Sequence, residues 1–500
     1  MKVHTSCLGS NFEKIVSDAI QAHQPIADTG VAVAVIKNGQ IAYAAGFGYR
    51  DRATSAPVDA STCFAIGSAT KAFTSMAVSM WVDLNKLTLD TPIGHYLTDF
   101  QLEDPQATQQ ATLTDVLSHQ TGLAPHNCLW YLGPFNRAGL YYRLRYLQPA
   151  VPFRSKFVYN NLMYMVAGYL LETNSGTSYE DIITSSILKP LAMNDTNLSF
   201  DALIHGSNYA KGYELGNELA LKDFANIGPA AEVNSTALDM ARWVQLFLNK
   251  GISSGGTALV TAASLELMYK PIVDAGDGTM YGLGWNITSI PATVSGTTQQ
   301  KRLVFHTGDP VGGSAYVSFM PDDALGLVLL TNQHCTANLV GTWPDKVATD
   351  IYDFLINGAV TGQVQLPKPS LAHGLGMAAA SAAAAAPPPA AAASTPATSP
   401  AAAPATSPGV PSIYAGMYSN DGYGDFAIGM AGRNLTISYY GSSWPMQPIT
   451  DIFFEFQVPA FGTIFPVLVA FESDAPGGIK GFKAPLVELP TVLMIPFEKR

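Results

Sequence analysis

The chain has 500 residues, a formal net charge of −11 and only 13% charged residues. Nucleic-acid binding needs clustered Lys and Arg, so this acidic balance argues against a nucleic-acid partner. No run of 18 or more strongly apolar residues occurs, and the N-terminal stretch lacks the apolar core of a signal peptide. We therefore expect no membrane span and, unless a leader has been removed, a cytoplasmic protein.

The first 370 residues mix strand and helix patterns. Asn38-Gly39 separates two apolar runs, which predicts a β-hairpin. Apolar residues recur at helical spacing after Gly67. Further helices are expected over 162–172 and 238–248, and strands over 303–305, 315–319 and 325–330. Strands open and close this region while helices fill its middle. The order predicts an α+β fold, with an antiparallel sheet whose first and last strands meet and helices packed on it.

A compositional break divides the rest of the chain. Every residue from Ala378 to Pro408 is Ala, Pro, Ser or Thr, so this segment cannot bury a core and indicates a semi-stiff tether. The following 90 or so residues alternate short apolar runs with turn residues, which predicts a small all-β barrel or sandwich, and of these we expect a lipocalin-like barrel. The expected domains are 1–370, a linker over 371–411, and 412–500.

Ser68 and Lys71 form the first candidate for chemistry, a Ser-x-x-Lys element that opens the first long helix. A spacing of three on a helix places both side chains on one face. Serine is a weak nucleophile until a base takes its proton, and a lysine whose pKa is lowered by desolvation can be that base. A second such element, Ser186 to Lys189, ends at Pro190 and is interpreted as a chance copy.

Two further elements follow in chain order, Tyr159-Asn160-Asn161 before a helix and His306-Thr307-Gly308 after a strand. Together with Ser-x-x-Lys they resemble the β-lactamase and penicillin-binding-protein-like serine hydrolases. The segments TDVLSHQTGL (114–123), LKPLAMNDT (188–196), YGLGW (281–285) and GLVLLTNQ (326–333) also resemble that family. The resemblance covers roughly residues 12–360. It implies an antiparallel sheet flanked by helices plus an all-helical subdomain.

The resemblance implies three catalytic residues. Ser68 is expected to be acylated, and Lys71 to share or accept its proton. Tyr159, as a phenol of low pKa beside Lys71, is expected to relay the proton to and from the leaving group. The backbone N–H groups of Ser68 and Asp309 are expected to form the oxyanion hole.

Other matched residues are expected to bind the substrate or support the site. Asn161 would orient Lys71 or a substrate amide, while His306, with Gly308 beside it, would contact the substrate or Tyr159. We interpret His119 as a scaffold residue. Glu232 stands where family members often have glycine, and either lines the cleft or is structural.

These patterns predict a serine hydrolase that acts on small amides, peptides (D-amino-acid-containing ones included) or esters, with no metal or organic cofactor. His306 replaces the lysine usual in transpeptidases and secreted β-lactamases, so β-lactamase activity ranks lower. An acyltransferase or peptide macrocyclase using the same acyl-enzyme is the alternative, because only the acceptor differs. A non-catalytic scaffold is a third possibility. The expected partner is a small-molecule or peptide substrate, and a homodimer is one possible assembly.

Overall fold

The computed structural model describes residues 3–4, 8–9, 11–214, 216–294, 297–334, 343–366, 414–431, 434–448, 453–460, 463–473, 479–487 and 493–500. The Ala/Pro-rich segment predicted as a tether lies outside these ranges. The chain divides into two compact units, which are Met1–Pro125 with Phe135–Gly376, and His126–Pro134 with Met377–Arg500. No helix among the described residues has the length and apolar character needed to cross a membrane.

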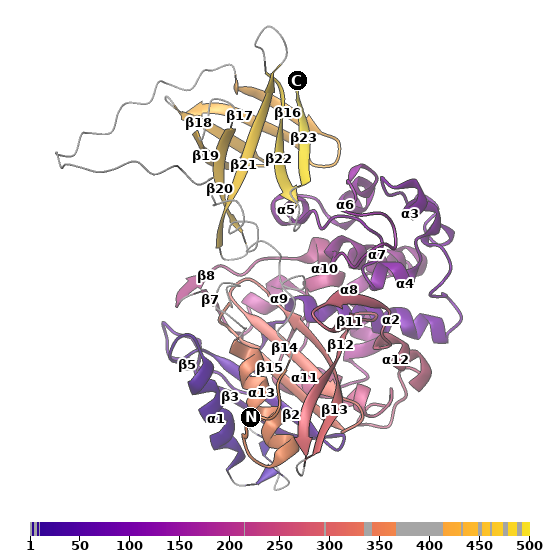
Figure 1. Ribbon diagram of the computed structural model, residues 1–500, viewed down its shortest axis with the longest axis vertical. Helices are drawn as coiled ribbons and strands as arrows, with labels where there is room; N and C mark the ends of the chain where they lie inside the picture. Colours follow the sequence, from indigo (N-terminus) through magenta and orange to yellow (C-terminus); the bar gives the residue numbers. More distant parts are fainter. Residues whose placement is uncertain are drawn as a thin grey trace, which may run out of the picture. The chain divides into compact units, whose positions relative to one another are not determined.

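A nine-stranded antiparallel sheet organises the first unit (Figure 1). Its order is β1-β3-β2-β15-β14-β13-β12-β11-β10. The strands are β1 (Val3–His4), β2 (Val31–Lys37), β3 (Gln40–Phe47), β10 (Val273–Gly276), β11 (Thr279–Tyr281), β12 (Asn286–Val294), β13 (Thr297–Gly308), β14 (Ser314–Met320) and β15 (Leu325–Thr331).

The sheet confirms the predicted meeting of early and late strands. β2 pairs with β15 in antiparallel register, from Val31 opposite Thr331 to Lys37 opposite Leu325. Asn38 and Gly39 both have positive φ, as the tight turn between β2 and β3 requires. The predicted strands over 303–305, 315–319 and 325–330 lie within β13, β14 and β15.

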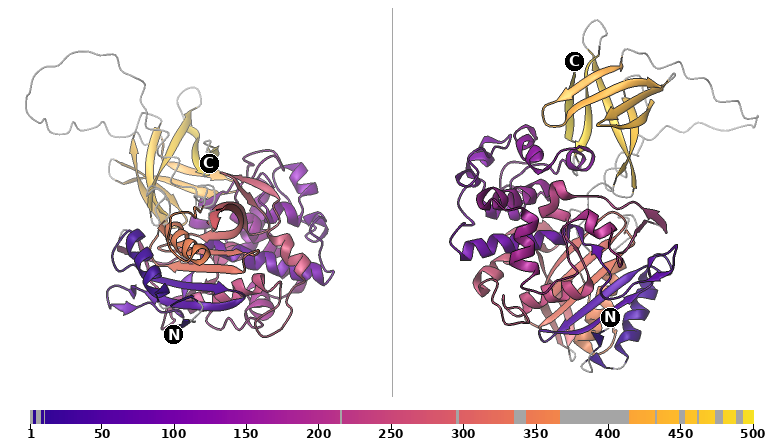
Figure 2. Two further views of the ribbon diagram at one scale, coloured as in Figure 1. Left: turned by 60° about the horizontal axis from the view of Figure 1, so that its bottom comes forward. Right: turned by 180° about the vertical axis from the view of Figure 1, so that it is seen from behind.

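Helices cover both faces of this sheet. α1 (Phe12–His23) and α13 (Trp343–Asn357) pack together over one face, where their apolar residues form a core with alternate residues of β2 and β15 (Figure 2, α13 in orange). α11 (Ala237–Leu248) packs against β2, β14 and β15. Because both faces are covered, β15 is buried along its whole length.

The first unit has further α-helices, of which the first continues the Ser-x-x-Lys turn. They are α2 (Lys71–Asp83), α3 (Pro105–Gln110), α4 (Leu113–Leu117), α6 (Arg137–Arg143), α7 (Asn161–Ser175), α8 (Tyr179–Ile183), α9 (Phe200–Ile204), α10 (Gly228–Ala231) and α12 (Ala262–Met268). α7 packs against α2, α4 and α10. Short strand pairs join β4 (Tyr49–Asp51) to β5 (Ala56–Pro57), β6 (Phe64–Ala65) to β9 (Asn234–Ser235), and β7 (Gly212–Glu214) to β8 (Asn217–Leu219).

The second unit contains a closed barrel, as the strand pattern predicted. Its strands are β16 (Gly416–Asn420), β17 (Gly424–Ala431), β18 (Asn434–Tyr439), β19 (Ser442–Pro448), β20 (Phe453–Ala460), β21 (Thr463–Ser473), β22 (Ile479–Val487) and β23 (Leu493–Lys499). Each pairs with the next in the chain, and β23 closes on β16. Phe426, Phe482 and Phe497 pack ring to ring in its core. A segment from early in the chain, α5 (Asn127–Leu132), belongs to this unit and packs against β22.

Candidate active site

Ser68 lies in a single 3-10 turn, Gly67–Thr70, and the α-helix begins only at Lys71. The turn follows β6 and packs against α10 and the end of β13. Ser68 is half-buried, whereas the Lys71 side chain has no exposed surface. The two side chains lie on one face as expected, with Lys71 Nζ 3.0 Å from Ser68 Oγ.

Lys71 is held by three oxygen atoms in a buried setting. Besides Ser68 Oγ, Nζ lies 2.7 Å from Asn161 Oδ1 and 3.2 Å from the Ala230 carbonyl oxygen. Burial lowers the pKa of Lys71 well below its usual range, because the charged form loses its hydration. A neutral amine has two N–H groups for Asn161 and Ala230. In that form one lone pair is left for the Ser68 hydroxyl, as a general base requires.

Tyr159 borders the same amine, but its protonation differs from our expectation. Lys71 Nζ lies 4.6 Å from the centre of the Tyr159 ring. Burial raises the pKa of Tyr159 well above 10, and a hydrogen bond with Ser68 only partly offsets this. The expected phenol of low pKa is therefore wrong for this structure. Desolvation favours the neutral form of both groups, which is the protonated phenol of Tyr159 and the unprotonated amine of Lys71.

The two adjacent asparagines have different contacts. Asn161 begins α7 and contacts Lys71. Asn160 caps α7 by accepting a hydrogen bond from the Met163 N–H, while its own N–H donates to His119 Nδ1 at 3.0 Å. His119 is completely buried, and its ring lies 4.4 Å from that of Tyr159. Asn160 and His119 thus hold the loop that carries Tyr159 and Asn161.

His306, on β13, is completely buried, so its ring presents no surface to a substrate in this structure. Its Nε2 lies 3.0 Å from the Tyr281 hydroxyl, and its ring centre lies 6.5 Å from that of Tyr159. The structure therefore places His306 in the aromatic cluster around Tyr159. This agrees with the expected neighbourhood of Tyr159.

Gly308 and Asp309 follow at the end of β13. A methyl group on Gly308 would lie 1.8 Å from the Ile66 carbonyl oxygen and 3.2 Å from the Ser68 nitrogen. Glycine thus allows β13 to approach the Ser68 turn closely. The Asp309 nitrogen lies beside the same turn, because a Cβ on Gly67 would be 3.1 Å from it. The Asp309 carboxylate accepts a hydrogen bond from the Ser314 hydroxyl, and burial raises its pKa.

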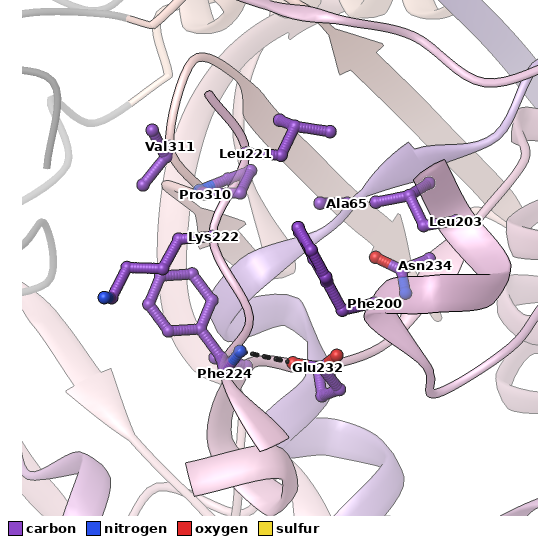
Figure 3. Close-up of a pocket in the computed structure, with 11 residues that line it drawn as sticks. Ala65, Phe200, Leu203, Leu221, Lys222, Phe224, Glu232, Asn234, Pro310 and Val311 are labelled. Atoms are coloured by element: carbon purple, nitrogen blue, oxygen red, sulfur yellow. Dashed lines mark hydrogen bonds between the residues drawn. The ribbon is translucent and has the colours of Figure 1, made fainter. Parts of the chain in front are cut away.

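Glu232 is buried and lines a small pocket beside these elements (Figure 3). Its carboxylate accepts a hydrogen bond from the Phe224 N–H at 2.8 Å. Burial raises the pKa of Glu232 to about 8. The rest of the lining is mostly apolar: Ala65, Phe200, Leu203, Leu221, Lys222, Phe224, Ala231, Asn234, Pro310 and Val311. The pocket adjoins the site, because Ala65 precedes the Ser68 turn and Ala231 follows the carbonyl that contacts Lys71.

The second Ser-x-x-Lys element has a different setting. Ser186 donates its hydroxyl hydrogen to the Ile182 carbonyl at 2.5 Å, and Lys189 is exposed. That lysine therefore lies in solvent, unlike the fully buried side chain of Lys71.

Three contributors to the site were missed by sequence reasoning. The Ala230 carbonyl is a backbone group and carries no residue signature. Asn160 was noted only as the middle residue of the Tyr159-Asn160-Asn161 element. Tyr281 lies in the YGLGW segment, whose match to the family was the one available signal.

The antiparallel sheet with helices on both faces, together with the Ser–Lys pair beside a Tyr-Asn-Asn loop, defines a protein of the β-lactamase and penicillin-binding-protein type. The family model described as Beta-lactamase matches residues 20–346, and the chain belongs to this family.

Curated relatives share about two thirds of this chain. It is 29% identical to Unguisins hydrolase ungD' of Aspergillus campestris in an alignment of length 356 that covers 67% of this chain and 64% of that protein. It is 25% identical to Protein flp of Staphylococcus aureus (strain N315) in an alignment of length 335 that covers 64% of this chain and 62% of that protein. The chain thus spans less than two thirds of the length of these relatives.

Solved structures show the same fold. The octameric penicillin-binding protein homologue from Pyrococcus abyssi superposes with a TM-score of 0.59 at 18% identity, covering 98% of this chain and 99% of that one. The class C β-lactamase from Rhodobacter sphaeroides gives a TM-score of 0.57 at 21% identity, covering 69% and 99%.

Proposed function

We propose that this protein is a serine hydrolase that forms an acyl-enzyme on Ser68 and hydrolyses small amide, peptide or ester substrates. One observation carries the proposal, which is the buried Lys71 amine with Nζ 3.0 Å from Ser68 Oγ, while Asn161 Oδ1 and the Ala230 carbonyl oxygen are within hydrogen-bonding distance of the same atom. Such a pair converts a weak nucleophile into a reactive one at neutral pH.

The proposed acylation step follows from this geometry. Ser68 Oγ attacks the substrate carbonyl carbon while its proton passes to the lone pair of Lys71. The negative charge that develops on the carbonyl oxygen is stabilised by the backbone N–H groups of Ser68 and Asp309. Collapse of the tetrahedral intermediate breaks the bond to the leaving group, which receives the proton held by Lys71, either directly or through the phenol of Tyr159, so that Lys71 is neutral again. Lys71 then takes a proton from a water molecule as it attacks the acyl carbon. The bond to Ser68 breaks, Ser68 Oγ regains this proton, and the acid is released.

The acceptor separates a hydrolase from the alternative acyltransferase or macrocyclase. Two of the curated relatives are named unguisins hydrolases, from Aspergillus campestris and Aspergillus violaceofuscus, which favours water as the acceptor. The likeness to a class C β-lactamase concerns the fold, so we propose no action on β-lactams. The cytoplasmic location and the homodimer remain predictions.

A fluorophosphonate probe followed by peptide mass mapping tests the proposal. We expect one adduct, on Ser68, that is lost in Ser68→Ala. The matched control is Ser186→Ala, which removes the serine of the second Ser-x-x-Lys element and is expected to label like the wild type. Absence of an adduct on Ser68 in the folded wild-type protein would refute the proposal and favour a scaffold.

A substrate panel then defines the acyl and acceptor groups. It comprises D- and L-aminoacyl p-nitroanilides, short-chain p-nitrophenyl esters, a cephalosporin and a peptidyl thioester. Linear acid products support a hydrolase, whereas a cyclic product from the thioester supports a macrocyclase.

A further inference from the structure

A nine-residue segment from the first third of the chain folds with the barrel. His126–Pro134 belongs to the second unit, although the residues on either side of it belong to the first. Its helix α5 packs against β22 of the barrel (Figure 1), and Leu129 and Trp130 within it are almost completely buried. The barrel therefore holds a segment whose flanking chain belongs to the catalytic unit.

The first residue of this segment is fixed by a specific contact. His126 Nδ1 lies 2.7 Å from the Tyr423 hydroxyl, and neither side chain is more than 1% exposed. His126 also has a φ of +46°, in the left-handed region that costs free energy for a residue with a side chain. Surrounding contacts must hold it there, and the hydrogen bond to Tyr423 is one of them.

The residues just before this segment are fixed from the catalytic side. The Asn160 side-chain amide donates to the Leu123 and Ala124 carbonyl oxygens, at 3.0 and 2.9 Å. Asn160 has no exposed surface and stands between Tyr159 and Asn161, whose side chain contacts Lys71. These two carbonyls therefore anchor the loop that carries the candidate catalytic residues.

A single residue, Pro125, separates the two anchor points. Its ring fixes φ, and the residue before a proline is restricted to extended conformations. The two Cα steps from Ala124 to His126 span at most about 7 Å. Such a short, stiff connector has little slack, so a displacement of His126 moves the Ala124 carbonyl as well.

We propose that the barrel is a positioning element for the acylation site, in which Tyr423 holds His126 and thereby fixes the Leu123 and Ala124 carbonyls that anchor Asn160. The coupling runs along the covalent chain and does not depend on the orientation of the two units. His126 and Tyr423 are positioning residues, since neither touches the reacting atoms. The catalytic part of this inference rests on the proposed function.

The test compares two tyrosine-to-phenylalanine variants of the full chain. Tyr423→Phe removes the hydroxyl that contacts His126. Tyr418→Phe is the matched control, because Tyr418 is equally buried in the same barrel and donates its hydroxyl hydrogen to the Tyr414 carbonyl at 2.6 Å. Each variant is measured for thermal stability, the rate of fluorophosphonate labelling at Ser68, and deuterium uptake of peptides covering 120–126 and 157–164.

We expect Tyr423→Phe to slow labelling about tenfold, which corresponds to the loss of one hydrogen bond of ~1.4 kcal/mol. Deuterium uptake should rise in 157–164, where the Asn160 and Met163 amides are hydrogen-bonded. On an ester substrate kcat should fall with KM unchanged. Tyr418→Phe should lose similar stability but keep wild-type labelling and uptake.

Substitutions of His126 give a second, independent comparison. His126→Ala should behave like Tyr423→Phe. His126→Asn should retain labelling, because an asparagine amide places a polar atom near the position of Nδ1 and tolerates positive φ. If Tyr423→Phe does not fold, the comparison of His126→Ala with His126→Asn still tests the proposal.

Equal labelling and equal uptake in Tyr423→Phe and Tyr418→Phe would overturn the inference. Failure of the proposed function gives a different result, since the wild-type protein would then show no adduct on Ser68. In that case the deuterium-uptake measurement is the only test of whether the Tyr423–His126 contact is coupled to the Asn160 loop. A rise in 157–164 confined to Tyr423→Phe supports it, and unchanged uptake overturns it.

Discussion

Replacing Lys71 with arginine tests whether catalysis depends on a lone pair or on a positive charge. Guanidinium stays protonated and has no acceptor site, whereas the Lys71 amine is buried and its pKa is well below the usual range. Arginine keeps donors for Asn161 and Ala230 but cannot take the Ser68 proton. A general base contributes about 10²- to 10⁴-fold to such a step, so labelling of Ser68 should slow by that factor.

The pH dependence of labelling gives the same test in the wild-type protein. The rate should rise with pH as Lys71 loses its proton, and level off well below the pH at which an ordinary lysine titrates. Lys71→Arg should show no such rise. The measurement is the pseudo-first-order rate of fluorophosphonate labelling between about pH 5 and 10, a range that lies below the pKa of about 10.4 of an ordinary lysine.

Stability should follow the same titration. The pKa of Lys71 is lower in the folded than in the unfolded state. Between those two values the unfolded chain binds more protons, so stability rises with pH. Each unit of lowering contributes ~1.4 kcal/mol. Lys71→Met should remove this slope in urea unfolding. The labelling test can also refute the reasoning. If Lys71→Arg labels at more than about a tenth of the wild-type rate, the loss of rate is smaller than the smallest general-base contribution, and the reasoning is wrong.

Three further predictions concern the residues around this pair. Gly308→Ala places a methyl group 1.8 Å from the Ile66 carbonyl oxygen. It should lower stability by about 1–3 kcal/mol and suppress labelling. Gly94→Ala, where nothing lies within 4 Å, should change neither, and equal melting temperatures in the two variants would contradict this. Tyr159→Phe keeps the ring but removes the proton donor. It should slow cleavage of anilides, whose leaving group needs a proton, far more than that of p-nitrophenyl esters. An equal loss on both would argue against proton donation. Glu232, with a pKa raised to about 8, favours folding at low pH. That contribution is lost as pH rises from about 4.5 through 8. Glu232→Gln should flatten the melting temperature over this range, and an unchanged slope would assign the pH dependence to other groups.

Local patterns predicted much of the architecture because their physical causes are local. Asn38-Gly39 tolerates the positive φ values of a tight turn, so the hairpin was visible in the sequence. The late strands were predictable because they are short apolar runs between turn residues. Helices α7 and α11 were predictable because their apolar residues recur at helical spacing. The pairing of β2 with β15 followed from their opening and closing the same region.

The boundaries of the second unit were not predictable in this way. The segment His126–Pro134 has the composition of any helix in the first region, yet it folds with the barrel. Nothing local marks this, because the partner of His126 lies almost 300 residues away, at Tyr423. Long-range burial decides such contacts, and burial leaves no periodic signal when a segment is only nine residues long.

For the candidate site, too, some features were predictable from the local sequence and others depended on the folded structure. Spacing alone placed Ser68 and Lys71 on one face, and family motifs added Tyr159, Asn161 and Gly308. The protonation of these groups was beyond the sequence, since a pKa depends on desolvation and on neighbours brought together by folding. Tyr159 was expected to be acidic, but burial raises its pKa instead.

The sequence by itself determined the family, the α+β fold with a following barrel, and the residue types at the site. These depend on short motifs, on hydrophobic period and on composition, all of which are readable along the chain. Only the tertiary structure decided that Lys71 is buried against Ser68 and Asn161, that His306 is buried, and that α5 belongs to the barrel unit. Each of these results from removing particular atoms from water beside partners that are remote in sequence.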